Sequence, residues 1–416
     1  MDNILRAFIS ALLKQGCVEV ETASGAHFTV GDGALPKVGL KFTDKAAQIA
    51  FMINPPLKLG ELFMNGRFEV TYGSIYDLLT IVSRNVPRIR RFFWVRVVER
   101  LHAVADRVSR YNNKRRARRN VAHHYDLDRR LYDMFLDADM QYSCAYFERD
   151  DDTLDVAQLA KKRHIAAKLL LEPGHRILDI GCGWGGMGLY LARFCGAKVT
   201  GVTLSEEQLA VAKKRAVDEG FSNVTDFRLQ DYRDVGERFD RIVSVGMFEH
   251  VGVEFFSEFF TKITQLLSDD GVMLLHTIAR GDGPGPTNPW ITKYIFPGGY
   301  IPTMSEIAPQ LERVGLVVTD VEVLRLHYAK TLRAWRERFL AHREEARTLY
   351  DERFCRMWEF YLAASECAFR YEQVVVFQIQ LAKKVDTVPL TRMYIGIKEA
   401  ELRRQDTAAS ALRIAG

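Results

Sequence analysis

The feature that most constrains the fold is an alternation of strands and helices that starts with a glycine-rich turn near residue 180. The stretch "RILDIGCG" (176–183) is an apolar run that ends in glycines. Further strand-like runs follow it at 197–204, 223–231, 239–246 and 271–279, with helical segments between them. This alternation predicts a doubly wound, mostly parallel α/β sheet. Two late strands, 316–324 and 374–384, would complete it, with a helical insertion at about 325–373.

One helix of this alternation has clear start and stop signals. The segment "SEEQLAVAKKRAVDEG" follows the second strand, with Ser205 placed to cap the amino end and Gly220 placed to end the helix. These signals support the strand–helix rhythm on which the fold assignment depends.

The glycine loop "LDIGCGWGG" fits both a nicotinamide site and an S-adenosylmethionine site, because both bring a ligand close to backbone without Cβ atoms. Asp179 precedes the first glycine by two residues, where an anion would repel a pyrophosphate but suit an ammonium group. A dinucleotide fold also needs an acid at the tip of the second strand. Here that tip is Thr203-Leu204-Ser205, and Glu206 and Glu207 already lie inside the helix. The loop therefore favours a methyltransferase over a dehydrogenase.

Before the sheet, the chain divides into two further regions. Residues 1–83 read as a small α+β domain, with a hairpin signal in "VEVETASGAHFTVG". Residues 84–119 form a basic linker with thirteen Lys or Arg and two acids, and within it "RIRRFFWVR" places Phe92, Phe93 and Trp94 among arginines. That pattern suits an anionic membrane surface, a nucleic acid or a solvated linker helix. Residues 120–416 are the predicted catalytic domain.

Composition narrows the class of protein further. No apolar run reaches the roughly 20 residues of a membrane span, and the N-terminus is a poor signal peptide. Six scattered cysteines without a CxxC argue against a disulfide framework or a zinc site, so we expect no metal and a cytoplasmic location. Residues 290–377 hold fifteen aromatics, which predicts either a large apolar pocket or a well-filled core beneath a helical lid.

The stretch "SVGMFEHVG" (244–252) places an acid, Glu249, just beyond a strand predicted to be buried. A carboxylate in that position needs a partner or a function. The neighbouring His250 is expected to point elsewhere on the turn and to be structural.

Several short stretches together resemble one family. They are "YSCAYF" (142–147), "LDIGCGWGG", "GVTLSEEQ" (201–208), "LQDYRD" (229–234), "SVGMFEH", "LLHTIA", "NPWITKYIFPGGYIP" (288–302) and "TLRAWRERF" (331–339). In this order they resemble the cyclopropane-fatty-acyl-phospholipid synthases and their mycolic-acid relatives over about 120–385, and "LKLGELFMNG" resembles the N-terminal domain of the phospholipid-acting branch. The resemblance implies a Rossmann-like class I methyltransferase sheet and methylene transfer from S-adenosylmethionine to the cis alkene of a phospholipid acyl chain.

The resemblance also implies particular site residues. Those expected to contact S-adenosylmethionine are Tyr142, Ser143, Gly181, Gly183, Thr203, Leu204, Gln208, Asp231 and Tyr232, beside Asp179 from the loop argument. Those expected to hold a bicarbonate ion near the sulfonium are Cys144, Glu249, His276, Ile278 and Tyr328. In that set His276 and Tyr328 would donate to the anion, Cys144 and Ile278 would act through main-chain groups, and Glu249 would accept the bicarbonate hydroxyl proton. Each of these residues taken alone could equally be a packed or capping residue.

One position departs from the family. Relatives often carry a cysteine where Ser365 stands in "YLAASECAFR", and this chain has Cys367 two residues later. A shift of two residues on a helix turns a side chain about 200° away, so Cys367 is no substitute. We expect the chemistry to need no thiol.

Four readings of the function remain open at this point. C-methylation of the same alkene without ring closure is the nearest alternative. A non-catalytic lipid-binding protein is disfavoured by the intact loop, Asp179 and Gln208. A nucleic-acid methyltransferase lacks a base-flipping signature, so no nucleic-acid partner is expected. For the leading reading we expect an unsaturated phospholipid substrate, peripheral binding at the inner, anionic face of the membrane, and a homodimer, as relatives suggest.

Overall fold

The computed structural model describes residues 1–89 and 127–415. Contacts divide the described chain into two compact units. The first takes residues 1–89, 285–297 and 329–374, and the second takes 127–284, 298–328 and 375–415. Helix α4 (Ile75–Ile89) runs through the predicted boundary at residue 83. Most of the basic linker, including Phe92, Phe93, Trp94 and the boundary at 119, lies outside the described residues.

The second unit is built on a seven-stranded sheet of order β10-β11-β9-β8-β5-β6-β7. Its strands are β5 (Arg176–Ile180), β6 (Lys198–Thr203), β7 (Thr225–Leu229), β8 (Phe239–Val245), β9 (Leu267–Arg280), β10 (Val317–Val323) and β11 (Val374–Ala382). The pairs β5–β6, β6–β7, β5–β8 and β8–β9 are parallel, and β10 is antiparallel to β11. All seven predicted strands are present, so the predicted doubly wound fold is confirmed.

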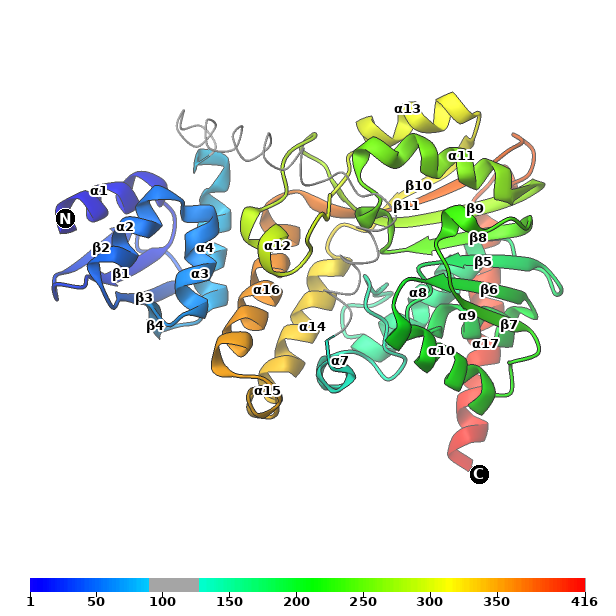
Figure 1. Cartoon of the computed structure of the whole chain (residues 1–416), viewed down its shortest axis with the longest axis horizontal. Coiled ribbons are helices and arrows are strands. Elements are labelled where there is room, and N and C mark those ends of the chain that lie inside the picture. Colours follow the sequence, from blue (N-terminus) through cyan, green and yellow to red (C-terminus); the bar gives the residue numbers. More distant parts are fainter. Residues whose placement is uncertain (90–126, 416) are drawn as a thin grey trace. The chain divides into compact units, whose positions relative to one another are not determined.

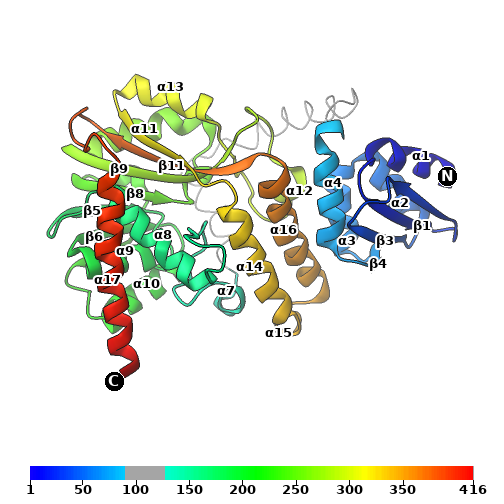
Figure 2. The ribbon, with the colours of Figure 1, turned by 180° about the vertical axis from the view of Figure 1, so that it is seen from behind.

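Helices cover both faces of this sheet (Figures 1 and 2). On one face α11 (Phe256–Leu266) and α13 (Met304–Val314) bury side chains such as Phe259 and Leu311 against β8, β9 and β11. On the other, α8 (Leu154–Lys168), α9 (Gly186–Cys195) and α17 (Met393–Ala415) pack against β5, β8 and β9. Helix α10 (Glu206–Asp218) packs beside α9 on β7. Shorter elements are α7 (Arg129–Phe135), η1 (Tyr232–Asp234), η2 (Phe248–His250) and η3 (Val253–Phe255).

The expected caps of α10 are present. The Ser205 side chain accepts a hydrogen bond from the Gln208 backbone N–H, and Gly220 follows the helix with φ of +78°. An N-terminal cap of this kind contributes about 1 kcal/mol to helix stability. It also fixes the point at which the chain turns from β6 into the helix, directly beside the predicted cofactor residues.

The first unit holds a four-stranded sheet of order β2-β1-β3-β4. Its elements are α1 (Asp2–Leu12), β1 (Cys17–Glu21), β2 (His27–Gly31), β3 (Lys37–Phe42), α2 (Lys45–Ile53), α3 (Pro55–Met64), β4 (Phe68–Tyr72), α4, α12 (Pro289–Tyr294), α14 (His327–Ala341), α15 (Arg343–Leu349) and α16 (Glu352–Tyr371). Strands β1 and β2 pair antiparallel, as the hairpin signal predicts. Helix α14 begins in the second unit and continues into the first.

The aromatic-rich insertion fills a core with the N-terminal elements. The ring of Trp290 lies 4.6 Å from that of Phe360, and Phe360 lies 6.2 Å from Phe63 on α3. A Cβ on Gly60 would come 2.4 Å from Trp290 Nε1, so only glycine lets α12 approach α3 this closely. From its sequence, this insertion was expected to belong to the catalytic domain. By contacts, residues 329–374 group instead with the N-terminal unit, because these rings pack on it.

Candidate active site

The glycine loop lies between β5 and α9, at the carboxyl end of the sheet. Gly181 and Gly183 have φ of +81° and +53°, a left-handed conformation that favours glycine. The N–H groups of Gly181 and Cys182 both donate to Val202 O on β6, at 2.9 and 3.1 Å. A Cβ on Gly181 would come 2.9 Å from Met247 Cβ. The loop therefore brings bare backbone to the place where an open α/β sheet binds its ligands.

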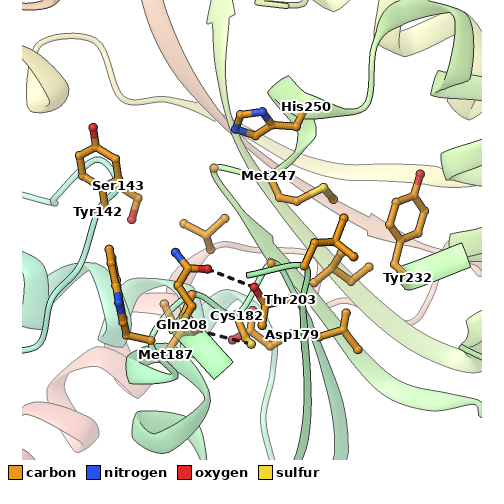
Figure 3. Close-up of a pocket in the computed structure, with 18 of the residues that line it drawn as sticks. Tyr142, Ser143, Asp179, Cys182, Met187, Thr203, Gln208, Tyr232, Met247 and His250 are labelled. Carbon is orange, nitrogen blue, oxygen red and sulfur yellow. Dashed lines mark hydrogen bonds between the residues drawn. The ribbon is translucent and has the colours of Figure 1, made fainter. Parts of the chain in front are cut away.

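A cavity of about 150 Å³ opens above this loop (Figure 3). All ten residues predicted to contact the cofactor line it. They are Tyr142, Ser143, Asp179, Gly181, Gly183, Thr203, Leu204, Gln208, Asp231 and Tyr232. These residues come from the ends of β5, β6 and β7 and from the segment before α8. The fold thus brings together groups that the sequence separates by up to ninety positions.

Asp179 is the acid at the floor of the cavity. It is buried, and its Oδ2 has no hydrogen-bond partner among the described residues. Burial raises the pKa of Asp179 to about 7, although the nearby Lys161 opposes that shift. A buried carboxylate oxygen without a partner is destabilising unless a ligand supplies one. The group fits a cation such as an ammonium.

Lys161 holds one wall of the cavity. Its Nζ donates to Gln141 Oε1 at 2.7 Å and to Ser143 Oγ at 2.8 Å, and the whole side chain is buried. Burial lowers the pKa of Lys161 to about 8. Gln158 Nε2 adds hydrogen bonds to the carbonyls of Gln141 and Ser143. Helix α8 therefore fixes the segment that carries Tyr142 and Ser143.

The opposite wall is fixed by side chains at the ends of β6 and β7. Thr203 Oγ1 donates to Gln208 Oε1 at 3.1 Å, and this hydrogen bond is one of those drawn in Figure 3. The Asp231 carboxylate accepts hydrogen bonds from Arg233 Nε and Nη2 at 2.8 and 2.7 Å. A bidentate pair of this kind restricts the carboxylate to one orientation. Asp231 and Gln208 therefore present polar atoms in set positions at the rim.

The cavity also has lining residues that were not predicted from the sequence, and two of them come from one turn. They are Met247 and His250, and His250 points elsewhere on the turn than Glu249, as expected, but into the cavity (Figure 3). They lie three residues apart around η2, and residues i and i+3 share a face in a 3₁₀ turn. This spacing was the available signal. Burial lowers the pKa of His250 to about 4, so the imidazole is neutral near pH 7.

A second polar group lies at the ends of β8 and β9. Glu249 Oε1 accepts a hydrogen bond from the Ile278 backbone N–H at 2.6 Å, and Glu249 Oε2 has no partner among the described residues. Burial raises the pKa of Glu249 to about 7. His276 is buried on β9 opposite Val245, and its Nε2 likewise lacks a partner in residues 1–89 and 127–415. An acceptor and a ring nitrogen are thus both left for a ligand.

The remaining predicted residues are placed as follows. Cys144 is buried in the segment before α8 with its thiol directed to Ala145 O at 3.3 Å, and Tyr328 is buried at the start of α14. Ile278 was predicted to contact the anion through a main-chain group, and its N–H donates to Glu249 Oε1. In the first unit, Cys367 is buried 3.6 Å from Thr80 Oγ1, and burial raises the pKa of Cys367 to about 12. That thiol is therefore not a nucleophile near pH 7.

The comparison with known proteins decides the family. The model for "Mycolic acid cyclopropane synthetase" matches residues 112–379, more than half of the chain. The chain belongs to the mycolic acid cyclopropane synthetase family. It is 37% identical over 385 residues to the cyclopropane-fatty-acyl-phospholipid synthase of Escherichia coli (strain K12), covering 90% of this chain and 98% of that protein.

The names of other similar proteins include different activities. A probable fatty acid methyltransferase of Pseudomonas putida is 41% identical over 274 residues, or 64% of this chain and 68% of that protein. Among solved structures, the mycolic acid cyclopropane synthase CmaA1 complexed with SAH and CTAB is 36% identical with a TM-score of 0.61, covering 64% of this chain and 97% of that one. The family match confirms an S-adenosylmethionine-dependent enzyme.

In the part of the chain that the structure describes, no cluster of three or more His, Cys, Asp or Glu side chains could hold a metal ion. Across residues 1–89 and 127–415, no helix is both long and apolar enough to cross a bilayer.

Proposed function

We propose that this protein transfers a methylene group from S-adenosylmethionine to the cis double bond of an unsaturated phospholipid acyl chain, forming a cyclopropane fatty acid. The observation that carries this proposal is the match to the Escherichia coli phospholipid-acting synthase over nearly the full length of both chains. Because the match includes the N-terminal region, it extends beyond the sheet shared with other methyltransferases.

The cavity residues fit S-adenosylmethionine. When bound, this cofactor supplies an electrophilic methyl group on a positively charged sulfur. Asp179, with its unpartnered oxygen, would take the ammonium group. The bare backbone at Gly181 and Gly183 and the fixed polar atoms of Gln208 and Asp231 would hold the rest. Tyr142, Ser143, Thr203, Leu204 and Tyr232 complete the proposed contacts.

The second polar group fits a small oxyanion, and bicarbonate is the one we propose. Bicarbonate held there would supply a base without a long side chain in the acyl site. His276 Nε2 would donate to one oxygen, and Glu249 Oε2 would accept the hydroxyl proton. The Ile278 N–H contributes by orienting Glu249. Cys144 and Tyr328 are proposed to complete the site.

The chemistry sets what the residues must achieve. A carbon–carbon bond forms to the alkene as the carbon–sulfur bond breaks, which leaves a cation on the acyl chain. A proton then leaves the transferred methyl, and its C–H electron pair closes the ring. The site must hold the alkene in line at about 3–3.5 Å and exclude water, which would trap the cation. The buried surroundings of Glu249 and His276 favour that exclusion.

C-methylation without ring closure remains a second candidate, favoured by the likeness to the Pseudomonas putida methyltransferase. The two outcomes differ only in which proton leaves the cation. Loss from the transferred methyl closes the ring, and loss from the acyl chain leaves a methylated alkene. Placement of the base relative to the cation therefore decides between them.

We further propose that the protein acts as a homodimer at the anionic inner face of the cytoplasmic membrane. The support, which concerns the membrane surface alone, is chemical. The acyl substrate resides in the bilayer, and the basic, aromatic segment 84–119 has a composition that suits an anionic surface. Sedimentation with anionic vesicles, lost at high salt, would support the membrane part. Equal recovery with neutral vesicles would contradict it.

Expression in a bacterial host that lacks such an enzyme tests the proposed reaction. Lipid mass spectrometry should show cis-unsaturated chains converted to species one methylene heavier that resist bromine addition. Glu249→Gln expressed to the same level should give little of this product. Heavier chains that still add bromine would instead support C-methylation.

A further inference from the structure

In the second unit, the buried side chains of Lys168 and Gln378 form a hydrogen-bonded line that ends at His276. Lys168 Nζ, at the end of α8, donates to Gln378 Oε1 on β11 at 2.8 Å. Gln378 Nε2 lies 3.2 Å from His276 Nδ1 on β9. Lys168 and Gln378 are fully buried, and His276 is 2% exposed. Water therefore cannot substitute for any of these contacts.

The chemistry of Lys168 determines which group donates and which accepts in each hydrogen bond of this line. An ammonium group has three donors and no acceptor, so it must face the carbonyl oxygen of the Gln378 amide. The amide nitrogen then faces His276, and it can only donate. His276 Nδ1 must accept that hydrogen bond. In a neutral imidazole one nitrogen carries the proton, so the proton is on Nε2.

The outer end of the line is fixed by charge. Lys168 Nζ also donates to Glu322 Oε2 on β10, and Glu322 lies 2.7 Å from His164 Nε2. Burial alone would raise the pKa of Glu322, but the hydrogen bonds and charges of His164 and Lys168 hold it below its ordinary value. The Glu322 carboxylate keeps the Lys168 ammonium in place, which prevents Gln378 from rotating its amide.

The inner end of the line is His276, whose Nε2 belongs to the proposed oxyanion site. His276 Nε2 has no protein partner in the described chain, and neither has Oε2 of Glu249, which lies in η2 and accepts from the Ile278 N–H on β9 through its other oxygen. Burial and the cations of Lys161 and Lys168 keep the pKa of His276 well below its ordinary value, so the ring stays neutral. An Nε2–H group donates to an oxyanion, whereas the other tautomer would present a lone pair and repel it.

We propose that Lys168 and Gln378 are positioning residues that fix His276 as the Nε2–H tautomer and so set it as a hydrogen-bond donor to the reaction's oxyanion. The oxyanion part rests on the proposed function. The tautomer part rests only on the contacts of Lys168, Gln378 and His276. The two parts can therefore fail separately.

The tautomer can be read directly by two-bond ¹H–¹⁵N correlation spectra of ¹⁵N-histidine-labelled full-length protein, because the three imidazole states have distinct nitrogen shifts. The His276 signal is assigned by its loss in His276→Gln. Wild type should show Nε2–H at pH 8. A wild-type signal of the Nδ1–H form, or of an imidazolium, would overturn the proposal without any variant having to fold.

The decisive variant is Gln378→Glu. Its carboxylate accepts from Lys168 with one oxygen, and the other can only accept, so His276 should change to Nδ1–H. In bicarbonate-depleted buffer the KM for added bicarbonate should rise about tenfold or more, with the affinity for S-adenosylmethionine unchanged. Retention of Nε2–H in Gln378→Glu would overturn the proposal.

A matched control lies two residues along the same strand. Gln380 is equally buried, and its Nε2 donates to Lys168 O and Tyr394 OH rather than to His276. Gln380→Glu should leave the His276 tautomer as in wild type, and a change equal to that of Gln378→Glu would indicate only a general effect of burying a carboxylate. If wild type shows Nε2–H but bicarbonate does not shift the His276 signal, the proposed oxyanion role fails and the positioning role stands.

Discussion

Replacing Asp179 by Asn should stabilise the ligand-free protein and weaken cofactor binding at the same time. The folded protein holds the pKa of Asp179 near 7 because the carboxyl is buried without a partner. The unfolded chain loses the same proton near pH 4. Between these values the folded state binds more protons than the unfolded state, so stability falls as pH rises through that window. Asn cannot ionise and avoids this loss.

The magnitude follows from the shift of about three pKa units at about 1.4 kcal/mol each. The free energy of unfolding of Asp179→Asn should exceed that of wild type by ~4 kcal/mol at pH 8 and by ~1.4 kcal/mol at pH 5. A hydrogen bond to a charged group contributes about 1.5–3 kcal/mol, so the affinity for S-adenosylmethionine should fall about 10- to 100-fold.

Urea unfolding at the two pH values tests the predicted gain in stability, and titration calorimetry with S-adenosylmethionine tests the predicted loss of affinity. Asp240→Asn is the control, because Asp240 Oδ2 accepts from Arg176 N at the opposite end of β5, away from the cavity. That variant should bind the cofactor like wild type. The reasoning is refuted if Asp179→Asn is no more stable at pH 8 than wild type, or if it binds S-adenosylmethionine with undiminished affinity.

Three further outcomes follow from the site. Glu249→Gln should lower turnover on the order of 100-fold while calorimetry shows cofactor binding within a few-fold of wild type; equal loss of binding would indicate a cofactor role instead. Because the pKa of Glu249 is about 7 and the ionised form is the proton acceptor, turnover of wild type should rise through pH 7, and a flat profile would contradict that role. Gly181→Ala should abolish cofactor binding, because its Cβ would meet Met247 Cβ at 2.9 Å and its φ is +81°, whereas an unchanged affinity would mean that the loop has room to adjust.

The sequence predicted the sheet well because its strands are long β-branched runs with capped helices between them. The ends of those strands also pointed to the cavity, since parallel strands bring their carboxyl ends to one edge. Asp179 and Thr203 could be placed in this way. The fold could therefore be predicted because its strands and helices have local sequence patterns.

What the sequence could not supply was side-chain direction and long-range packing. The inward turn of His250 depends on the 3₁₀ geometry of η2, and the engagement of the Ile278 N–H by Glu249 depends on a contact across two strands. The grouping of residues 329–374 with the N-terminal unit depends on contacts among Trp290, Phe360 and Phe63, which are up to 297 positions apart in the sequence. The i, i+3 spacing of Met247 and His250 is a weak local signal for the first of these contacts, and the other two have no local signature.

Counting deuterium atoms in the product tests the central claim most directly. Purified protein is incubated with cis-unsaturated phospholipid vesicles, bicarbonate and S-adenosylmethionine that carries a fully deuterated methyl group. Ring closure removes one deuteron from that methyl, so the account predicts acyl chains that keep two of its three deuterium atoms and have no double bond. Chains that keep all three deuterium atoms together with a double bond, or that carry no label, would contradict it.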